Sequence, residues 1–188
     1  MLIKICGIQD VETARFVQLT GADLIGVVFA KSKRQITKEV AQDIAKTVKI
    51  PVVGVFVNES IKTINQLVKD IPLDYVQLHG DETEDFAKKI TVPVIKAFKK
   101  GHENPHYASC YHLIDNEVAG AGIAYDYRTV TLSDRTFLAG GLTVENVTQA
   151  VQLQPIGIDV SSGVETNGVK DKIKIKQFIE KARSVTHV

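Results

Sequence analysis

The chain has 188 residues, 44% of them hydrophobic, and its 23 basic and 22 acidic residues leave a formal net charge of +1. The balanced charge argues against a nucleic-acid-binding surface. The apolar runs are only strand-sized, which argues against a transmembrane helix, and the N-terminus lacks the apolar stretch of a signal peptide. The two cysteines, Cys6 and Cys110, are too few for a disulfide framework and form no close metal-ligand pair, so we expect a cytoplasmic globular protein with no nucleic-acid or membrane partner.

Strand-like and helix-like segments alternate along the whole chain. Strands are predicted at 2–8, 23–29, 51–57, 74–79, 93–98, 111–116, 136–140 and 156–161. Amphipathic helices are predicted at 10–20, 37–48, 60–70, 82–90, 143–152 and 170–183. The connections near 102–109 and 127–134 look too short or too irregular for full helices.

Eight strands joined by crossover helices predict a parallel sheet, either closed into a barrel or open and doubly wound. An open sheet covered on both faces should show more continuous apolar strands, and no Gly-x-Gly-x-x-Gly follows the first strand. Closure is favoured by the count of eight and by polar residues at alternate positions late in the strands: Lys4, Cys6, Gln77, His79, Asp115, Asp159 and Ser161. We predict one (βα)8 TIM barrel over 1–188, a single compact domain with some shortened helices.

Cys6 is the first candidate for chemistry, because it ends a strand in which apolar and polar residues alternate. A thiol one strand step from Lys4 should ionise more easily than a free cysteine. The alternative is a buried and inert cysteine.

A phosphate site is predicted where the seventh and eighth strands end. Gly140 and Gly141 lie between a strand and a helix, and Ser161 follows the last strand in the run Asp159-Val160-Ser161-Ser162-Gly163. Loops at these two places bind phosphate in many such barrels through backbone amides and a helix N-terminus. The expected ligand is therefore a small molecule that carries a phosphate group.

Several strings of residues together resemble the phosphoribosylanthranilate isomerase family, over essentially the whole chain. They are Lys4-Ile5-Cys6-Gly7, Ser32-Lys33-Arg34, Gly54-Val55-Phe56-Val57-Asn58, Val76-Gln77-Leu78-His79-Gly80, Tyr125-Asp126-Tyr127, Ala139-Gly140-Gly141-Leu142 and Asp159-Val160-Ser161-Ser162-Gly163-Val164-Glu165. The resemblance implies a (βα)8 barrel and an Amadori rearrangement of N-(5′-phosphoribosyl)anthranilate in tryptophan biosynthesis. It also implies that no metal and no cofactor is needed.

The resemblance assigns the general base to Cys6 and the general acid to Asp126. An acid must hold its proton, and partial burial between Tyr125 and Tyr127 would favour this. Arg34 matches the family arginine that holds the anthranilate carboxylate; its alternative is a solvated cluster with Lys31 and Lys33.

Further residues are expected around the substrate. Gln77 and His79 should line the barrel interior, with a structural hydrogen-bonding role favoured over a catalytic one. Asp159 should order its loop, accept from a sugar hydroxyl or bond Ser161, while Cys110 is expected in the core at the opposite end of the barrel.

The chain departs from the family pattern before Asp126, where a Gly- and polar-rich loop is replaced by Ala119-Gly120-Ala121-Gly122-Ile123-Ala124, and at Tyr127, where tryptophan is usual. Two other functions stay open. A different phosphosugar isomerase or epimerase would need a metal site or paired acids. A non-catalytic phosphate-binding protein would need neither Cys6 nor Asp126. A monomer or a homodimer is expected.

Overall fold

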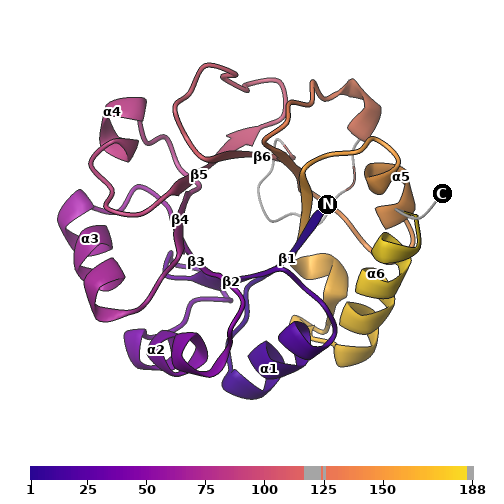
Figure 1. The fold of residues 1–188 in the computed structure, drawn as a ribbon, viewed down its shortest axis with the longest axis horizontal. Coiled ribbons are helices and arrows are strands. Elements are labelled where there is room, and N and C mark those ends of the chain that lie inside the picture. The colour runs from indigo at the N-terminus through magenta and orange to yellow at the C-terminus, as the bar shows by residue number, and fades with distance from the viewer. Residues whose placement is uncertain (117–123, 125, 186–188) are drawn as a thin grey trace.

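The computed structural model describes residues 1–116, 124 and 126–185. Eight parallel strands close into a barrel in chain order, β1 to β8, and the helices lie in a ring outside it (Figure 1). Each strand pairs with its sequence neighbour, and β1 closes the ring against β8 with Lys4 opposite Asp159. The predicted barrel is confirmed, and so is the preference for closure over an open sheet.

All eight predicted strands are present, most of them shorter at their ends than expected. They span β1 Leu2–Cys6, β2 Leu24–Val28, β3 Val52–Phe56, β4 Tyr75–Leu78, β5 Val94–Lys99, β6 Tyr111–Asp115, β7 Thr136–Leu138 and β8 Gly157–Val160. Only β5 runs past its predicted end. The residues trimmed from the C-terminal strand ends belong to the loops at the rim, which carry the candidate site.

The six predicted helices are also present, and two of them are short. They span α1 Val11–Leu19, α2 Lys38–Thr47, α3 Ile61–Asp70, α4 Glu84–Ala87, α5 Val147–Val151 and α6 Lys172–Ser184, with 3-10 turns η1 Tyr127–Thr129 and η2 Ser162–Val164. Residues 102–109 form no helix, as expected. Within the described part of the chain, no helix is both long enough and apolar enough to span a bilayer.

Polar residues start most of these helices. Asp10, Thr37, Ser60, Thr83 and Asp171 each accept a hydrogen bond from a backbone N–H in the first helical turn. Such a cap satisfies an amide that has no partner within the helix. The capping residues therefore define where these helices begin.

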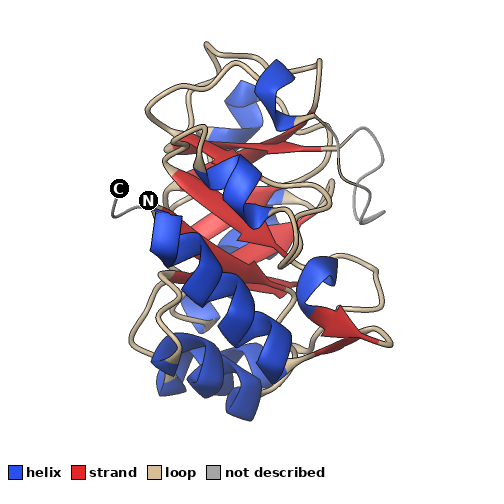
Figure 2. Ribbon diagram, turned by 90° about the vertical axis from the view of Figure 1, so that its right-hand side faces the viewer, coloured by secondary structure: helices blue, strands red, loops and turns tan. Residues whose placement is uncertain are grey.

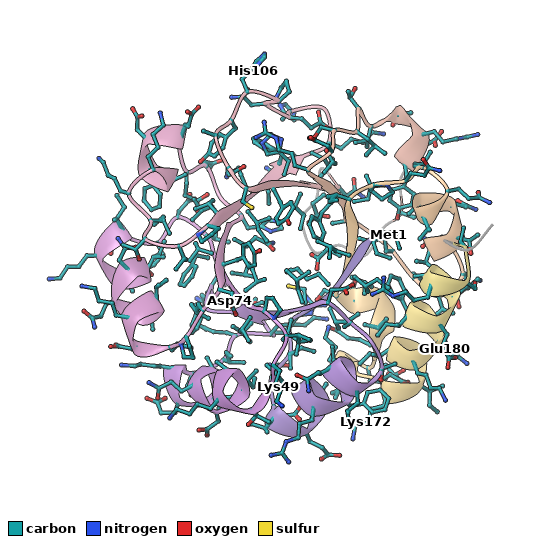
Figure 3. The ribbon with its side chains drawn as sticks, in the orientation of Figure 1. Met1, Lys49, Asp74, His106, Lys172 and Glu180 are labelled. Atoms are coloured by element: carbon teal, nitrogen blue, oxygen red, sulfur yellow. The ribbon has the colours of Figure 1, made fainter. Side chains whose placement is uncertain are left out.

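The apolar core has two parts. The larger lies between the strands and the surrounding helices, and a smaller cluster fills the barrel interior with residues such as Leu24, Val53, Leu113 and Phe137. Figure 3 shows side chains filling the ring of strands. Alternate strand residues point to these two layers, so polar residues that share the interior face with Leu24 or Phe137 meet at its C-terminal end.

A small antiparallel hairpin, which the sequence did not predict, follows β8. Its strands are β9 Glu165–Thr166 and β10 Val169–Lys170, joined by Asn167 and Gly168, both with positive φ. In Figure 2 it projects at the C-terminal end of the barrel strands, with the N-terminus at the opposite end. The hairpin shortens the helix expected at 170–183, which begins at Lys172.

Candidate active site

The C-terminal rim of the barrel carries two neighbouring hollows. The larger has a volume of about 600 Å³ and lies over the ends of β3 to β6, with His79, Lys99 and Asp115 in its wall. The smaller, of about 60 Å³, lies between β6, β7 and β8, lined among others by Gly140 and Ser161. Asp115 lines both, so one elongated ligand can reach from the predicted phosphate loops into the larger cavity.

Cys6 ends β1 on the interior face, with Lys4 one strand step below it. Lys4 is fully buried, and its Nζ donates to Oδ1 of Asp159 at 2.9 Å. Burial alone lowers the pKa of Lys4, but the Asp159 carboxylate and the Cys6 thiol together raise it above its ordinary value. Lys4 is therefore an ammonium ion next to the thiol.

The expectation that Cys6 ionises more easily than a free cysteine is wrong. Burial raises the pKa of the Cys6 thiol, and the nearby ammonium groups of Lys4 and Lys170 lower it only in part. The Lys4 charge is already shared with Asp159, so it cannot offset the full desolvation of the sulfur. Cys6 is buried, yet it lies beside charged groups and not in an apolar layer.

A glycine on the neighbouring strand makes room for this cluster. Gly26 of β2 pairs with Cys6, and a Cβ there would lie 2.7 Å from the Cys6 Sγ and 3.1 Å from the Lys4 Nζ. Any side chain at position 26 would therefore displace the thiol or its cation.

The loops after β7 and β8 meet at the predicted phosphate site. Gly140 and Gly141 both have positive φ, and a Cβ on Gly163 would lie 1.7 Å from the carbonyl oxygen of Leu142. Only glycine permits this approach of two backbones. Ser161 follows β8, and its hydroxyl donates to the Cys6 carbonyl at 3.1 Å, which joins these loops to the end of β1.

Gln77 and His79 line the interior as expected and contact each other. The Gln77 amide Nε2 lies 2.9 Å from the His79 Nδ1, and the His79 Nε2 lies 3.2 Å from Oδ2 of Asp115. The Gln77 Oε1 is buried and has no hydrogen-bond partner among the described residues. The hydrogen bond between the Gln77 amide and the His79 ring links the two side chains, and the histidine tautomer decides which of them donates.

Arg34 is not part of a solvated cluster. Its side chain is 11% exposed, whereas that of Lys33 is 62% exposed. The Arg34 Nε donates to Oε1 of Glu165 at 2.6 Å and Nη2 donates to Oε2 at 2.9 Å, a paired geometry that raises the pKa of the arginine. The alternative interpretation of Arg34 is therefore wrong.

Asp126 does not have the environment expected for an acid. Its side chain is 46% exposed and accepts two hydrogen bonds from the Arg128 guanidinium and one from the Arg128 backbone amide, which hold the pKa of the carboxyl below its usual value. Its carboxyl faces a surface depression lined by Gln149 and Gln152, not the barrel interior with Cys6. The expected burial between Tyr125 and Tyr127 is wrong: Tyr127 is buried, with its hydroxyl donating to the Gly140 carbonyl, but Asp126 points outward. Tyr125 and all of the altered loop 119–124 except Ala124 lie outside the described residues.

The expectation for Cys110 is also wrong. It is an exposed free thiol just before β6 begins at Tyr111, and therefore not a core residue. In the described part of the chain, no group of three or more His, Cys, Asp or Glu side chains is arranged to hold a metal ion.

Two buried carboxylates near the rim, Glu165 and Glu82, were not predicted as site residues from the sequence. Glu165 binds Arg34 and Lys170, and Glu82 binds Lys96 at 3.0 Å while accepting from the Asn58 and Gly80 amides. A lysine inside the apolar run of β5 could have signalled the second pair. Nothing local in the sequence signals the first, because Arg34 and Glu165 lie 131 positions apart.

Known proteins agree with this architecture. A family model for N-(5′-phosphoribosyl)anthranilate isomerase matches residues 3–181. A relative of that name from Streptococcus mutans is 45% identical over 96% of this chain and 98% of its own length. The phosphoribosyl anthranilate isomerase structure from Thermus thermophilus superposes with a TM-score of 0.91 at 32% identity, over 98% of this chain and 100% of that one.

A second similar structure is a phosphoribosyl anthranilate isomerase in complex with reduced 1-(o-carboxyphenylamino)-1-deoxyribulose 5-phosphate. It has a TM-score of 0.83 and 35% identity over 98% of this chain and 99% of that chain. The family match, the identity and the shared barrel all extend over nearly the whole sequence. The chain therefore belongs to the N-(5′-phosphoribosyl)anthranilate isomerase family.

Proposed function

We propose that residues 1–188 form one catalytic domain that converts N-(5′-phosphoribosyl)anthranilate into 1-(2-carboxyphenylamino)-1-deoxyribulose 5-phosphate in tryptophan biosynthesis. Family membership supports the reaction. The observation that carries the mechanism is Cys6, buried in a cluster of charged groups at the barrel mouth and joined to the phosphate-site loops through Ser161.

The substrate phosphate binds at the loops that carry Gly140, Gly141 and Ser161. All three residues line a small hollow, and glycines at two of these positions let the backbone approach a phosphate group closely. The sugar then extends past Asp115 and Asp159, and the anthranilate carboxylate binds Arg34.

The chemistry needs one proton donor and one base. Asp126 gives a proton to the ribose ring oxygen, the bond from that oxygen to C1′ breaks, and a protonated imine remains between C1′ and the anthranilate nitrogen. The Cys6 thiolate removes the proton from C2′, and the electron pair moves toward the imine nitrogen to form an enolamine. Loss of the C2′ hydroxyl proton and protonation at C1′ complete the ketone.

Asp126 can act as acid only after its carboxyl leaves Arg128 and turns to the mouth. This step is inexpensive because an exposed ion pair contributes little to stability. Lys4 keeps a positive charge beside the sulfur, which favours the thiolate that the base requires.

Turnover of N-(5′-phosphoribosyl)anthranilate, followed by the loss of anthranilate fluorescence, tests the proposal. Saturable turnover without added metal or cofactor is expected. Turnover that requires a divalent metal, or binding of the substrate without conversion, would instead indicate one of the two alternative functions. The cytoplasmic location and the monomeric or homodimeric state stay predictions, the latter measurable by light scattering.

A further inference from the structure

Glu165 ends one of the strings that carry the family resemblance, but the proposed reaction gives it no role. Its side chain is only 5% exposed, and it accepts paired hydrogen bonds from Arg34 and a third from the Lys170 Nζ at 2.7 Å. Burial raises the pKa of Glu165, but the hydrogen bonds and charges of Arg34 and Lys170 outweigh it and lower that pKa overall. The two cations hold this buried carboxylate in one position at the rim.

Lys170 ties this carboxylate to the barrel itself. Its side chain is 5% exposed, and its Nζ donates to the Ser161 carbonyl at 2.8 Å as well as to Glu165. Ser161 in turn donates to the Cys6 carbonyl. The β9–β10 hairpin brings Glu165 and Lys170 side by side. Lys170 therefore joins Glu165 to the end of strand β8, and Glu165 in turn binds Arg34 in the loop after β2.

The arginine is held along its length. Its aliphatic part lies against Gly7, where a Cβ would come within 2.6 Å of the Arg34 Cδ. Glu165 occupies Nε and one hydrogen of Nη2. Among residues 1–116, 124 and 126–185, none accepts a hydrogen bond from Nη1, so the edge formed by Nη1 and Nη2 can take a second carboxylate in the same plane.

We propose that Glu165, anchored by Lys170, is the positioning residue that turns this free edge of Arg34 toward the substrate, and so sets selectivity for a carboxylated aglycone. The proposal rests on the proposed function only in taking the carboxylate of the substrate as the partner of Arg34. Glu165 touches Arg34 and not the reacting atoms. Its effect should therefore depend on whether the ligand carries the carboxylate.

Two substitutions separate orientation from charge. Glu165→Gln keeps the length but loses the charge and one of the paired acceptors. Glu165→Asp keeps the charge but withdraws the carboxylate by one methylene, so it cannot hold both nitrogens in place. Arg34→Lys serves as the benchmark for loss of a planar carboxylate contact. Glu180→Gln is the matched control, since Glu180 projects from the outer face of α6 away from the barrel (Figure 3).

The readout is the ratio of kcat/KM for the natural substrate to kcat/KM for the analogue without the carboxylate. This ratio should fall roughly ten- to hundredfold in both Glu165 variants, mainly through KM, because a misaligned contact group costs about that much. Turnover of the analogue should change little, and Glu180→Gln should match the parent. Equal losses for both substrates, or a loss in Glu165→Gln with none in Glu165→Asp, would overturn the positioning role.

Binding without turnover keeps this test separate from the proposed function. Reduced 1-(o-carboxyphenylamino)-1-deoxyribulose 5-phosphate, the ligand of one similar structure, and its counterpart without the carboxyl group are titrated by isothermal titration calorimetry, which reports both ligands alike. A tenfold or larger weakening for the carboxylated ligand alone supports the proposal, and unchanged affinity overturns it. Absence of turnover in the parent would refute the proposed reaction. The binding of the two ligands would still test the role of Glu165, because it does not depend on turnover. Circular dichroism confirms that each variant is folded, and Glu165→Asp, which retains the buried charge, serves if Glu165→Gln does not fold.

Discussion

At the scale of single residues, the two groups assigned to proton transfer have opposite environments. Cys6 is buried with a raised pKa, and Asp126 is exposed with a lowered pKa. The proposed mechanism needs the thiolate of one and the carboxylic acid of the other. At neutral pH only a small fraction of the free protein carries both forms, so the surroundings of each group directly scale the rate.

Replacing Cys6 with serine should remove most of the turnover while leaving the fold intact. A hydroxyl of similar size preserves the packing against Gly26, but its far higher pKa makes it useless as a base. General-base catalysis contributes roughly 10²–10⁴-fold, so kcat should fall by at least that factor. Steady-state kinetics by fluorescence measures the change, and a variant with near-normal kcat would remove Cys6 from the mechanism.

The ion pair between Asp126 and Arg128 leads to a coupled prediction. Asp126→Asn should lower kcat with little change in KM, because an amide fills the same volume but cannot deliver the proton. Arg128→Gln should raise the pKa of Asp126, and with it the protonated fraction at neutral pH, so kcat/KM should rise about two- to fivefold, as for a weak surface pair.

The predicted rise in the pKa of Asp126 can be measured directly. In the pH profile of kcat/KM, the acidic limb should shift to higher pH in Arg128→Gln. Adding the same substitution to Asp126→Asn should change nothing further, because no titrating carboxyl remains at position 126. A rise in rate that persists in the double variant would show that Arg128 acts through something other than Asp126.

At the scale of elements, most helices begin where the preceding loop supplies a side chain that caps the first turn. The Ser60 hydroxyl accepts from the Thr63 amide at 3.1 Å and lies 2.8 Å from the Thr63 hydroxyl, directly before α3. Only one residue of α3, Ile64, is fully buried, so its first turn depends more on the cap than on packing.

Ser60→Ala should therefore destabilise the protein by about 1 kcal/mol, within the usual range for loss of an N-cap. Ser60→Thr is the control, since it retains the hydroxyl and should stay close to the parent. Urea unfolding followed by circular dichroism gives both values. Equal stability of the alanine variant and the parent would mean that the Thr63 amide finds another partner in the variant.

At the scale of the whole molecule, the side chains that stabilise the barrel and those that form the candidate site lie at different heights along its axis. Phe137 and its apolar neighbours fill the interior, while Lys4, Cys6, Asp115 and Asp159 gather toward the C-terminal rim. At the N-terminal end of β8, Gly157 makes room for the Phe137 ring, and a Cβ there would lie 2.3 Å from it. The polar groups therefore lie on a layer of close-packed apolar side chains around Phe137, which forms the floor of the site.

Gly157→Ala should overpack this floor and lower the free energy of unfolding by about 1–3 kcal/mol. Activity at 25 °C should change little, because the altered contact lies far below the rim. The double variant Gly157→Ala, Phe137→Leu should recover part of the lost stability, since the smaller side chain relieves the contact. Additive losses in the double variant would place the strain elsewhere; chemical unfolding and the fluorescence assay measure the two quantities.

The sequence by itself determined the order of strands and helices, the closure of the barrel and the rim position of Cys6, Gln77, His79 and Ser161. Those features follow from hydrophobic periods of two and about 3.6 and from polar residues at strand ends, which are local properties of the chain. Element ends were less well predicted, because loop geometry and packing decide the last residue of each strand.

Only the tertiary structure decided which side chains pair and how they are solvated. Closure of β1 against β8 brings Glu165 to Arg34 and Asp159 to Lys4 across most of the chain length. The raised pKa of Cys6 comes from burial by distant segments, and the lowered pKa of Asp126 comes from the outward turn that sets it beside Arg128. Periodicity fixes the face on which a residue lies, whereas partners and desolvation depend on what the closed barrel packs against that face.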